Sequence, residues 1–230
     1  ISERYFSAGQ LYSNKTIHEH QNDLIEYVNK EGQTICRKVK ASAGVYAETY
    51  YIYDDFGNLV MVIPPEGIAS LTSNITTKSI DNWTFQYRYD NRKRMTHKKI
   101  PGADWFYMVY DDRDRLVMTQ DGEQRKLGKW LLTKYDSMNR PVITGIYTHN
   151  AVLDQAAMST LPATKFSGRF DSLTVKYYDN YNFLRGPDFK YRSKQIDHQE
   201  ADAFRTVTGK TTGAWTRITG NDKRWLRSVT

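Results

Sequence analysis

The dipeptide Tyr-Asp occurs five times in this chain of 230 residues, and it constrains the fold more than any other feature. The flanking sequences match as well, so the repeated unit is longer than two residues. Self-similar units of this kind indicate a repeat architecture in which each unit packs on its neighbours. The five pairs are Tyr53-Asp54, Tyr89-Asp90, Tyr110-Asp111, Tyr135-Asp136 and Tyr178-Asp179.

The residues after each pair are typical of a hairpin turn. An aspartate begins the turn, where its carboxylate can accept hydrogen bonds from backbone amides two residues further on. Three positions later, four of the five copies carry a residue that tolerates the left-handed backbone conformation, which closes a type I turn. These closing residues are Gly57, Lys93, Asp114, Asn139 and Asn182, with Lys93 as the exception.

The next column carries arginine in three copies. A long cationic side chain leaving the turn is expected either to lie over the ring of the preceding tyrosine or to pair with the turn aspartate. The residues of this column are Arg94, Arg115 and Arg140, with Asn58 and Phe183 as the exceptions. An apolar residue such as Leu184 then opens the return strand, and alternating apolar residues around the turns predict strands on both sides.

The spacing of the repeats predicts where insertions interrupt the hairpins. The distances from aspartate to aspartate are 36, 21, 25 and 43 residues, and the short ones fit one hairpin and a link. The long intervals contain helix-like segments at Pro65–Leu71 and Asn150–Thr160, and a third helix is predicted at Ser193–Val207. Asp121-Gly122 is predicted to form a further hairpin turn.

We therefore expect a mainly β fold of tandem antiparallel hairpins in a curved, spiralling sheet with short helical insertions. The expected segment spans 1–230, with a degenerate repeat at 20–48, repeats around 50–64, 84–100, 105–120, 130–147 and 172–186, and insertions at about 65–80, 148–165 and 187–210. The chain begins with Ile and ends on residues that resemble the start of a strand. We expect it to be an excerpt of a longer protein, with unpaired sheet edges that favour association.

The composition argues against several classes of partner. The net charge is +7, but the basic residues are spread along the chain, so no nucleic-acid partner is expected. No apolar run approaches the roughly 18 residues that a membrane helix needs. These 230 residues contain no recognisable signal peptide, which says nothing about the longer protein that we expect. The single cysteine, Cys36, excludes an internal disulfide framework.

Candidate catalytic residues are few. Asp54-Asp55 and Asp111-Asp112 resemble the carboxylate pairs of glycosidases, but the first member of each pair is the turn residue of the repeat. Two separate aspartates, Asp104 and Asp188, are not explained by the repeat, and the sequence suggests no partner for either of them. We therefore expect no catalytic residues and no enzyme.

The candidates for a metal site or a ligand site are also few. His18 and His20 offer two imidazoles without a third ligand, so neither a metal nor a cofactor is expected. Trp83, Trp105 and Trp130 can be interpreted as ligand-facing rings that stack on sugars. The other interpretation is that the tryptophans fill the packed faces of the sheet.

These elements resemble the rearrangement-hotspot (RHS) or Tyr-Asp (YD) repeat family. The motif Tyr-Asp-x-x-(Gly/Asn/Asp)-(Arg/Asn) covers roughly residues 50–185, and the segments 50–66 and 99–111 are similar to the long surface or secreted versions of Bacteroidetes. The repeat residues with a structural role are Tyr53, Asp54, Gly57, Tyr89, Asp90, Arg94, Tyr110, Asp111, Arg115, Tyr135, Asp136, Arg140, Tyr178 and Asp179.

The resemblance implies a β ribbon that spirals into a hollow shell, often around a variable C-terminal toxin. The chain has no Asp-Pro dipeptide, so the self-cleavage residues of the family cannot be carried over. The expected function is a non-enzymatic shell segment of a secreted or cell-surface bacterial protein, whose partners would be the rest of its own shell and an enclosed toxin. The alternatives are an adhesion module that binds a carbohydrate or another partner and, last, a polysaccharide-active enzyme.

Overall fold

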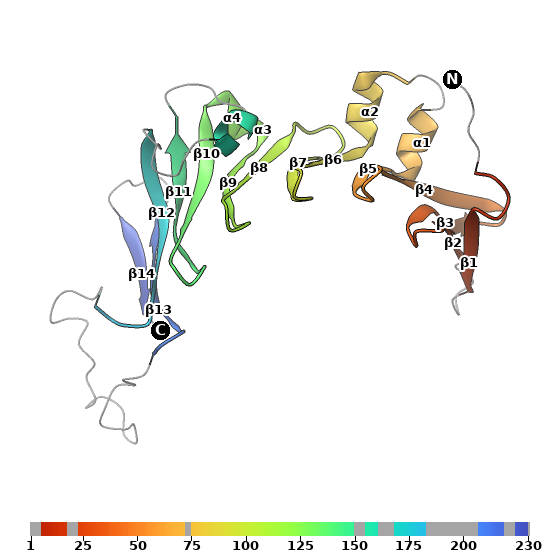
Figure 1. Cartoon of the computed structure of the whole chain (residues 1–230). Helices are drawn as coiled ribbons and strands as arrows, with labels where there is room; N and C mark the ends of the chain where they lie inside the picture. Colours follow the sequence, from red (N-terminus) through yellow and green to blue (C-terminus); the bar gives the residue numbers. More distant parts are fainter. Residues whose placement is uncertain are drawn as a thin grey trace. The chain divides into compact units, whose positions relative to one another are not determined.

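The computed structural model describes residues 6–17, 23–71, 75–149, 155–160, 168–182, 207–218 and 224–229. Within these ranges the strands are hydrogen-bonded to one another in the order in which they occur in the sequence, with antiparallel pairing (Figure 1). The expected fold class, a mainly β structure built from hairpins with short helices, is confirmed. The chain divides into two compact units, Ile1–Met108 and Val109–Thr230.

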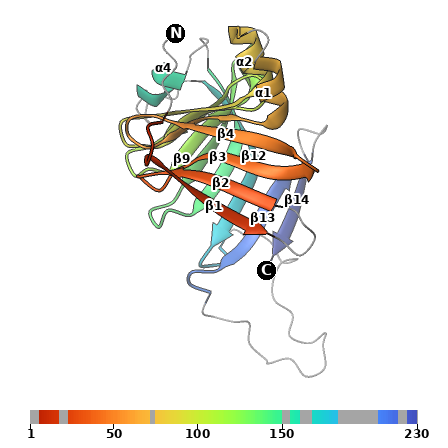
Figure 2. The ribbon, with the colours of Figure 1, turned by 90° about the vertical axis from the view of Figure 1, so that its right-hand side faces the viewer.

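The first unit contains seven strands and the beginning of an eighth among its described residues. They are β1 (Leu11–Ile17), β2 (Asp23–Asn29), β3 (Thr34–Ser42), β4 (Val45–Tyr53), β5 (Leu59–Ile63), β6 (Phe85–Tyr89), β7 (Met95–Lys99) and β8 (Phe106–Tyr110). Helices α1 (Pro65–Leu71) and α2 (Thr77–Trp83) connect β5 to β6 at the opposite strand ends from the Tyr-Asp turns (Figure 1, Figure 2).

Both helices of the first unit begin where the sequence supplies a start signal. Helix α1 begins at Pro65, as predicted, because the fixed φ of proline suits the first helical position. Helix α2 begins with a capping box, in which Thr76 Oγ1 accepts a hydrogen bond from Ser79 N at 3.0 Å and Ser79 Oγ accepts one from Thr76 N at 2.8 Å. Gly67 lets the two helices approach closely, since a Cβ there would lie 2.7 Å from Trp83 O.

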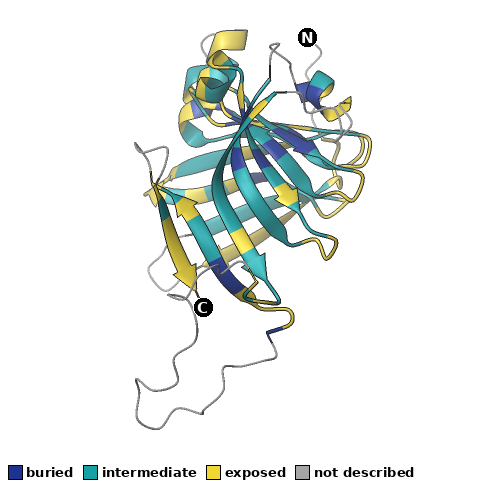
Figure 3. Ribbon diagram, turned by 90° about the vertical axis from the view of Figure 1, so that its left-hand side faces the viewer, coloured by how far each residue is buried: buried dark blue, intermediate teal, exposed yellow. Residues whose placement is uncertain are grey.

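Few side chains of the first unit are fully buried. Cys36 and Met108, at 5% and 7% exposure, are its buried apolar side chains among the described residues. Most other strand residues are half-buried, and strands of both units are coloured accordingly in Figure 3. Ion pairs such as Lys38–Glu48, 2.7 Å apart, lie across neighbouring strands. The first unit is therefore stabilised mainly by pairing between strands and between turns.

The second unit contains the rest of β8 and six further strands among its described residues. They are β9 (Leu116–Gln120), β10 (Lys129–Tyr135), β11 (Pro141–Thr148), β12 (Arg169–Tyr178), β13 (Thr211–Arg217) and β14 (Trp225–Val229). Two short helices accompany them, α3 (Gly122–Lys126) between β9 and β10, and α4 (Gln155–Thr160) between β11 and β12.

A small apolar core covers part of one sheet face in the second unit. Trp130 lies opposite Tyr147, and Leu132 lies opposite Met118, so the four side chains share this face. Helix α4 adds Met158, and all five side chains are at most 3% exposed. This core explains why tryptophan and methionine occur on strands that are otherwise half-buried.

The structure differs from the prediction at Asp121-Gly122, and it describes the two longer predicted helices only in part. Asp121-Gly122 does not form a hairpin turn, because Asp121 caps helix α3 and its carboxylate accepts a hydrogen bond from Gln124 N at 2.7 Å. In the insertion predicted to be helical at 150–160, α4 occupies Gln155–Thr160, and residues 150–154 lie outside the described ranges. The helix predicted at Ser193–Val207 lies outside them as well, except for Val207.

Candidate functional site: the linked turns

The first four Tyr-Asp pairs begin the same turn. In each one the aspartate N–H donates to the carbonyl four residues further on, and the aspartate carbonyl accepts from the N–H three residues further on. At Asp111 these hydrogen bonds measure 3.0 Å and 3.1 Å. The closing residues all have a left-handed backbone, with φ of 79° at Gly57, 59° at Lys93, 59° at Asp114 and 63° at Asn139. The turn therefore dictates the conformation of the closing position even where lysine occupies it.

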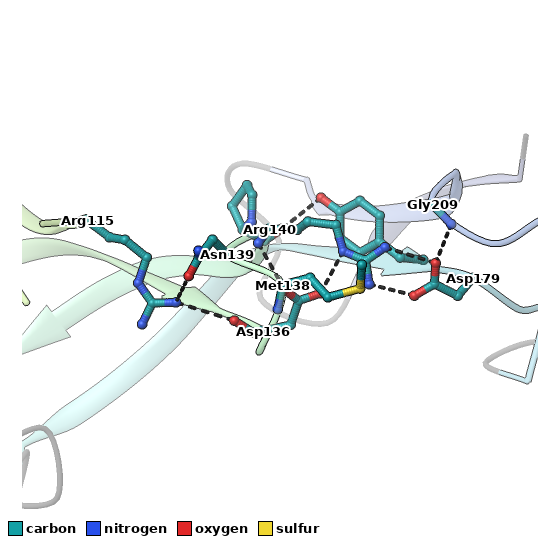
Figure 4. Close-up of polar contacts among 9 residues, drawn as sticks. Arg115, Asp136, Met138, Asn139, Arg140, Asp179 and Gly209 are labelled. Carbon is teal, nitrogen blue, oxygen red and sulfur yellow. Dashed lines mark hydrogen bonds and ion pairs between the residues drawn. The ribbon is translucent and has the colours of Figure 1, made fainter. Parts of the chain in front are cut away.

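The aspartate carboxylate organises each of these turns. Asp136 Oδ1 accepts hydrogen bonds from the backbone N–H groups of Met138 and Arg140, both at 2.9 Å, and Asp136 Oδ2 accepts one from Arg140 Nε at 2.7 Å (Figure 4). The same contacts join Asp90 to Arg94 and Asp111 to Arg115. Of the two arrangements considered for the arginine, the pairing with the turn aspartate is therefore present in all three copies that carry it.

These contacts favour the ionised form of the carboxylates. Hydrogen bonds from the backbone N–H and the side chain of Arg140 hold the pKa of Asp136 below its ordinary value. The Arg140 side chain, together with the Gly209 N–H, lowers the pKa of Asp179 to about 2. A carboxyl group that acts as a general acid needs a raised pKa. The environment of the turn aspartates therefore suits a structural role better than acid–base chemistry.

Acid is expected to weaken the structure through these carboxylates. A group with a lowered folded pKa stabilises the fold above its unfolded pKa of about 3.9, and the contribution is lost as the pH falls through the folded value. For Asp179 the loss is expected between about pH 4 and about pH 2. Urea denaturation across this range checks the prediction: Asp179→Asn should be less stable than wild type at neutral pH and should show a shallower decline in acid. Equal declines in the two proteins would contradict it.

In the second unit the arginines also connect successive turns. Arg115 Nη1 donates to Asn139 Oδ1 at 3.0 Å and to Asp136 O at 3.3 Å in the following turn. Arg140 Nη1 donates to Asp179 Oδ1 at 2.9 Å (Figure 4). Each guanidinium also lies over a tyrosine ring, 4.9 Å from the Tyr135 centroid for Arg115 and 4.4 Å from that of Tyr178 for Arg140. The ring belongs to the following repeat, and not to the same repeat as the sequence predicts.

Tyrosine hydroxyls link the hairpins in the opposite direction, from a later hairpin to an earlier one. In each link the tyrosine of a Tyr-Asp pair donates a hydrogen bond to a backbone carbonyl. The carbonyl belongs to the first residue of the return strand in the earlier hairpin. The links run from Tyr53 to Thr34 at 3.2 Å, from Tyr89 to Leu59 at 2.9 Å, from Tyr135 to Leu116 at 2.8 Å and from Tyr178 to Pro141 at 2.9 Å. Burial raises the pKa of the Tyr135 hydroxyl, which remains a protonated donor.

Removing one of these hydroxyls should have a measurable cost. Tyr135→Phe leaves the Leu116 carbonyl without this donor in a half-buried position, and we expect the free energy of unfolding to fall by about 1 kcal/mol. Tyr12→Phe is the matched control, because Tyr12 is 60% exposed and does not belong to a Tyr-Asp pair. Urea unfolding curves of both variants test the prediction, and equal effects would show that the hydroxyl link contributes nothing.

The turns of the first unit are linked by other side chains. Lys93 Nζ donates to Phe56 O in the preceding Tyr-Asp turn at 3.0 Å. Gln33 Nε2 donates to Gly57 O at 3.3 Å from a turn at Asn29–Gln33. Lysine at a closing position, which departs from the sequence pattern, thus has a local role in joining two turns.

The fifth Tyr-Asp pair departs from the others. Asp179 itself has a left-handed backbone, with φ of 68°, and its N–H donates to Lys210 O at 3.1 Å. Its carboxylate accepts a hydrogen bond from Gly209 N at 2.7 Å, and β12 pairs with β13 from Thr211 onward. Asn182 therefore does not close a five-residue turn here. The predicted return strand at Leu184 lies outside the described residues.

The three tryptophans considered as ligand-facing have different surroundings. Trp130 is 1% exposed in the core of the second unit, so the proposal of a ligand-facing ring is wrong there. Trp105 is half-buried, and the Arg88 guanidinium lies 4.5 Å from its ring centroid. Trp83, at the end of α2, is 40% exposed. Packing against neighbouring side chains accounts for two of these three rings.

Sequence reasoning missed an ion pair in the first unit that involves a buried lysine. Lys99 is 7% exposed, and its Nζ lies 2.9 Å from Asp81 Oδ2. Gln86 Nε2 donates to the other oxygen of Asp81 at 3.0 Å, so the carboxylate ties α2 to β6 and β7. Asp81 and Lys99 are 18 positions apart in no repeated pattern, so only the folded arrangement reveals the pair.

The remaining candidates do not assemble into a site. Asp104 is exposed, and Asp188, His18 and His20 lie outside the described ranges. Among the residues that the structure describes, no group of three or more His, Cys, Asp or Glu side chains is placed to hold a metal ion. Nor does any helix in the described ranges have the length and apolar character needed to cross a membrane.

No protein-family model and no curated protein matches this sequence. Among solved structures, TcdB2-TccC3-TEV aligns with a TM-score of 0.52 over 85% of this chain, at 12% sequence identity. The fold is shared. The Tc holotoxin pore of Photorhabdus luminescens aligns with a TM-score of 0.48 at 14% identity over 69% of this chain, and TcdB2-TccC3-Cdc42 with 0.44 at 12% identity over 91%. This chain covers only 8%, 7% and 12% of the three neighbouring chains, respectively.

Proposed function

We propose that this chain is a non-enzymatic wall segment of an RHS-type shell, which encloses or presents a toxin in a secreted or cell-surface protein. The observation that carries the proposal is the row of linked turns in each unit. Arginine, lysine and glutamine side chains join one turn to the next, and four of the five Tyr-Asp tyrosines donate their hydroxyls to an earlier hairpin. Such links hold successive hairpins of a thin sheet together.

The burial pattern supports a wall more than a self-contained binding domain. Most strand residues of the first unit are half-buried, and its described residues include few buried apolar side chains. The second unit adds only a small core beside α4. A sheet of this kind is thin, and each hairpin hides its edges by pairing with its neighbours.

The comparison with known structures supports the same proposal at the level of the fold. The TcdB2-TccC3 chains are Tc toxin chains with RHS repeats, and TcdB2-TccC3-TEV shares the fold of this chain. The repeat residues of this sequence resemble the RHS family independently of that structural likeness. The toxin cargo and the export of the protein are parts of the proposal that rest on this resemblance.

An electron cryomicroscopy structure of the full-length protein tests the proposed function. We expect residues 1–230 to form part of a continuous sheet with additional polypeptide enclosed on one side. A structure in which both sheet faces contact bulk solvent would contradict the wall. A hydrolase activity that is lost in Asp104→Asn would contradict the non-enzymatic role.

A further inference from the structure

The first turn of the first unit follows the geometry of the repeat without its arginine. Asn29 replaces the aspartate, its N–H donates to Gln33 O at 2.9 Å, and its carbonyl accepts from Gly32 N at 3.1 Å. Gly32 closes the turn with φ of 79°. Gln33 therefore occupies the position at which Arg115 and Arg140 reach the next turn in the second unit.

A groove of about 520 Å³ lies between this turn and the next one, Asp54–Asn58. The residues that line it include the aromatic Phe6, Tyr51 and Tyr53 and the acidic Glu31, Asp54 and Asp55. No lysine or arginine is among the described residues that line it. Tyr53 is the counterpart of Tyr135, the ring on which Arg115 lies in the second unit. The groove thus lies where the repeat elsewhere holds a guanidinium.

The charges in the groove are not balanced from within. Glu31 and Asp55 are exposed and have no hydrogen-bond or ion-pair partner in the part of the chain that the structure describes. Asp54 accepts its hydrogen bonds from its own turn, where Asn58 replaces the arginine found after Asp90, Asp111 and Asp136. Lys93 lies close enough to the Asp54 turn to stabilise the Asp54 carboxylate, since its Nζ donates to Phe56 O. In a chain of net charge +7, Glu31 and Asp55 are therefore the carboxylates of this groove that could receive a cation from outside.

The chemistry of the groove selects among cations. The described residues offer no metal-binding group of three ligands, whereas aromatic walls suit an organic cation with an apolar stem. A planar guanidinium stacks on a ring and pairs with a carboxylate through two N–H groups at once, which an ammonium group does not do. Arg115 makes both kinds of contact in this same fold.

We propose that this groove binds an arginine side chain of a partner polypeptide. Its guanidinium lies over the Tyr53 ring and pairs with Asp55 and Glu31, and it takes the place that Arg115 has between later turns. The groove is complete within the first unit, so the inference does not depend on the shell function.

Titration calorimetry with two short peptides tests this assignment. The probes are acetyl-Ala-Arg-Ala-amide and its citrulline counterpart, which has a similar shape without the charge. We expect the arginine peptide to bind at least about tenfold more tightly than the citrulline peptide, and salt to weaken it. Gln33→Arg supplies a guanidinium from within the chain and should weaken peptide binding by about tenfold or more.

Two further variants test whether the peptide binds in this groove or to carboxylates elsewhere on the protein. Glu31→Gln combined with Asp55→Asn should also lose the binding, and it decides the matter if Gln33→Arg fails to fold. Asp112→Asn removes a carboxylate at the position equivalent to Asp55 in a later turn, and its binding should match wild type. Equal binding of the two peptides, unchanged binding in the groove variants, or no binding by wild type would overturn the proposal. Dimerisation of the protein that Gln33→Arg abolishes would overturn it too, because the occupant would then be a second copy.

Discussion

Replacing Trp130 with alanine is expected to lower the free energy of unfolding by about 3 to 5 kcal/mol. The side chain is 1% exposed and packs in the small core that also contains Met118, Leu132 and Tyr147. A core of this size has few neighbours that can move into the cavity left by an indole. Chemical denaturation followed by circular dichroism measures the loss.

Trp83→Ala is the matched control for this prediction. Trp83 is 40% exposed at the end of α2, and we expect its replacement to cost less than about 1 kcal/mol. A loss for Trp130→Ala no larger than that for Trp83→Ala would show that the core of the second unit does not stabilise the fold as described.

Replacing Gly145 with valine is expected to cost about 3 kcal/mol. Gly145 lies in β11 at an irregularity in its pairing with β12. A Cβ at this position would lie 2.5 Å from Asp171 O and 2.7 Å from the Phe170 ring, so the neighbouring strand would have to move. The expected result is a lower unfolding midpoint together with faster amide exchange in β11 and β12.

Thr144→Val tests whether the close approach of β12 to Gly145 causes the loss of stability in Gly145→Val. Thr144 precedes Gly145 in the same strand and is half-buried, and it already has a β-branched side chain, so this change should cost less than about 1 kcal/mol. Similar stability of the two variants would mean that the strands separate at Gly145 at little cost.

The turns were predictable because their determinants are local. An aspartate with a left-handed residue three positions later specifies the turn within five residues, and four copies adopt it. Lys93 shows that the backbone conformation is required at the closing position even when the residue type is unusual there. The fifth copy could not be predicted in this way, since Asp179 forms hydrogen bonds with Arg140, Gly209 and Lys210, all of which are distant in the sequence.

The links between turns depend on the pairing of strands and are therefore not visible in any single repeat. Antiparallel pairing in sequence order places each turn beside the next, which brings Arg115 to Tyr135 and Asn139. Sequence reasoning considered the ring within the same repeat, because spacing alone favours close neighbours. Burial of Trp130 could not be predicted for a similar reason, since Tyr147 on the neighbouring strand is part of its surroundings.

The central claim is that linked turns keep an enclosing wall intact. The most direct measurement is a limited-proteolysis time course on the full-length protein, comparing wild type with the combined variant Arg115→Ala and Arg140→Ala. These arginines connect three successive turns of the second unit. We predict that polypeptide outside the repeats resists cleavage in wild type and is cut faster in the variant. Equal cleavage of that polypeptide in both proteins would contradict an enclosing wall.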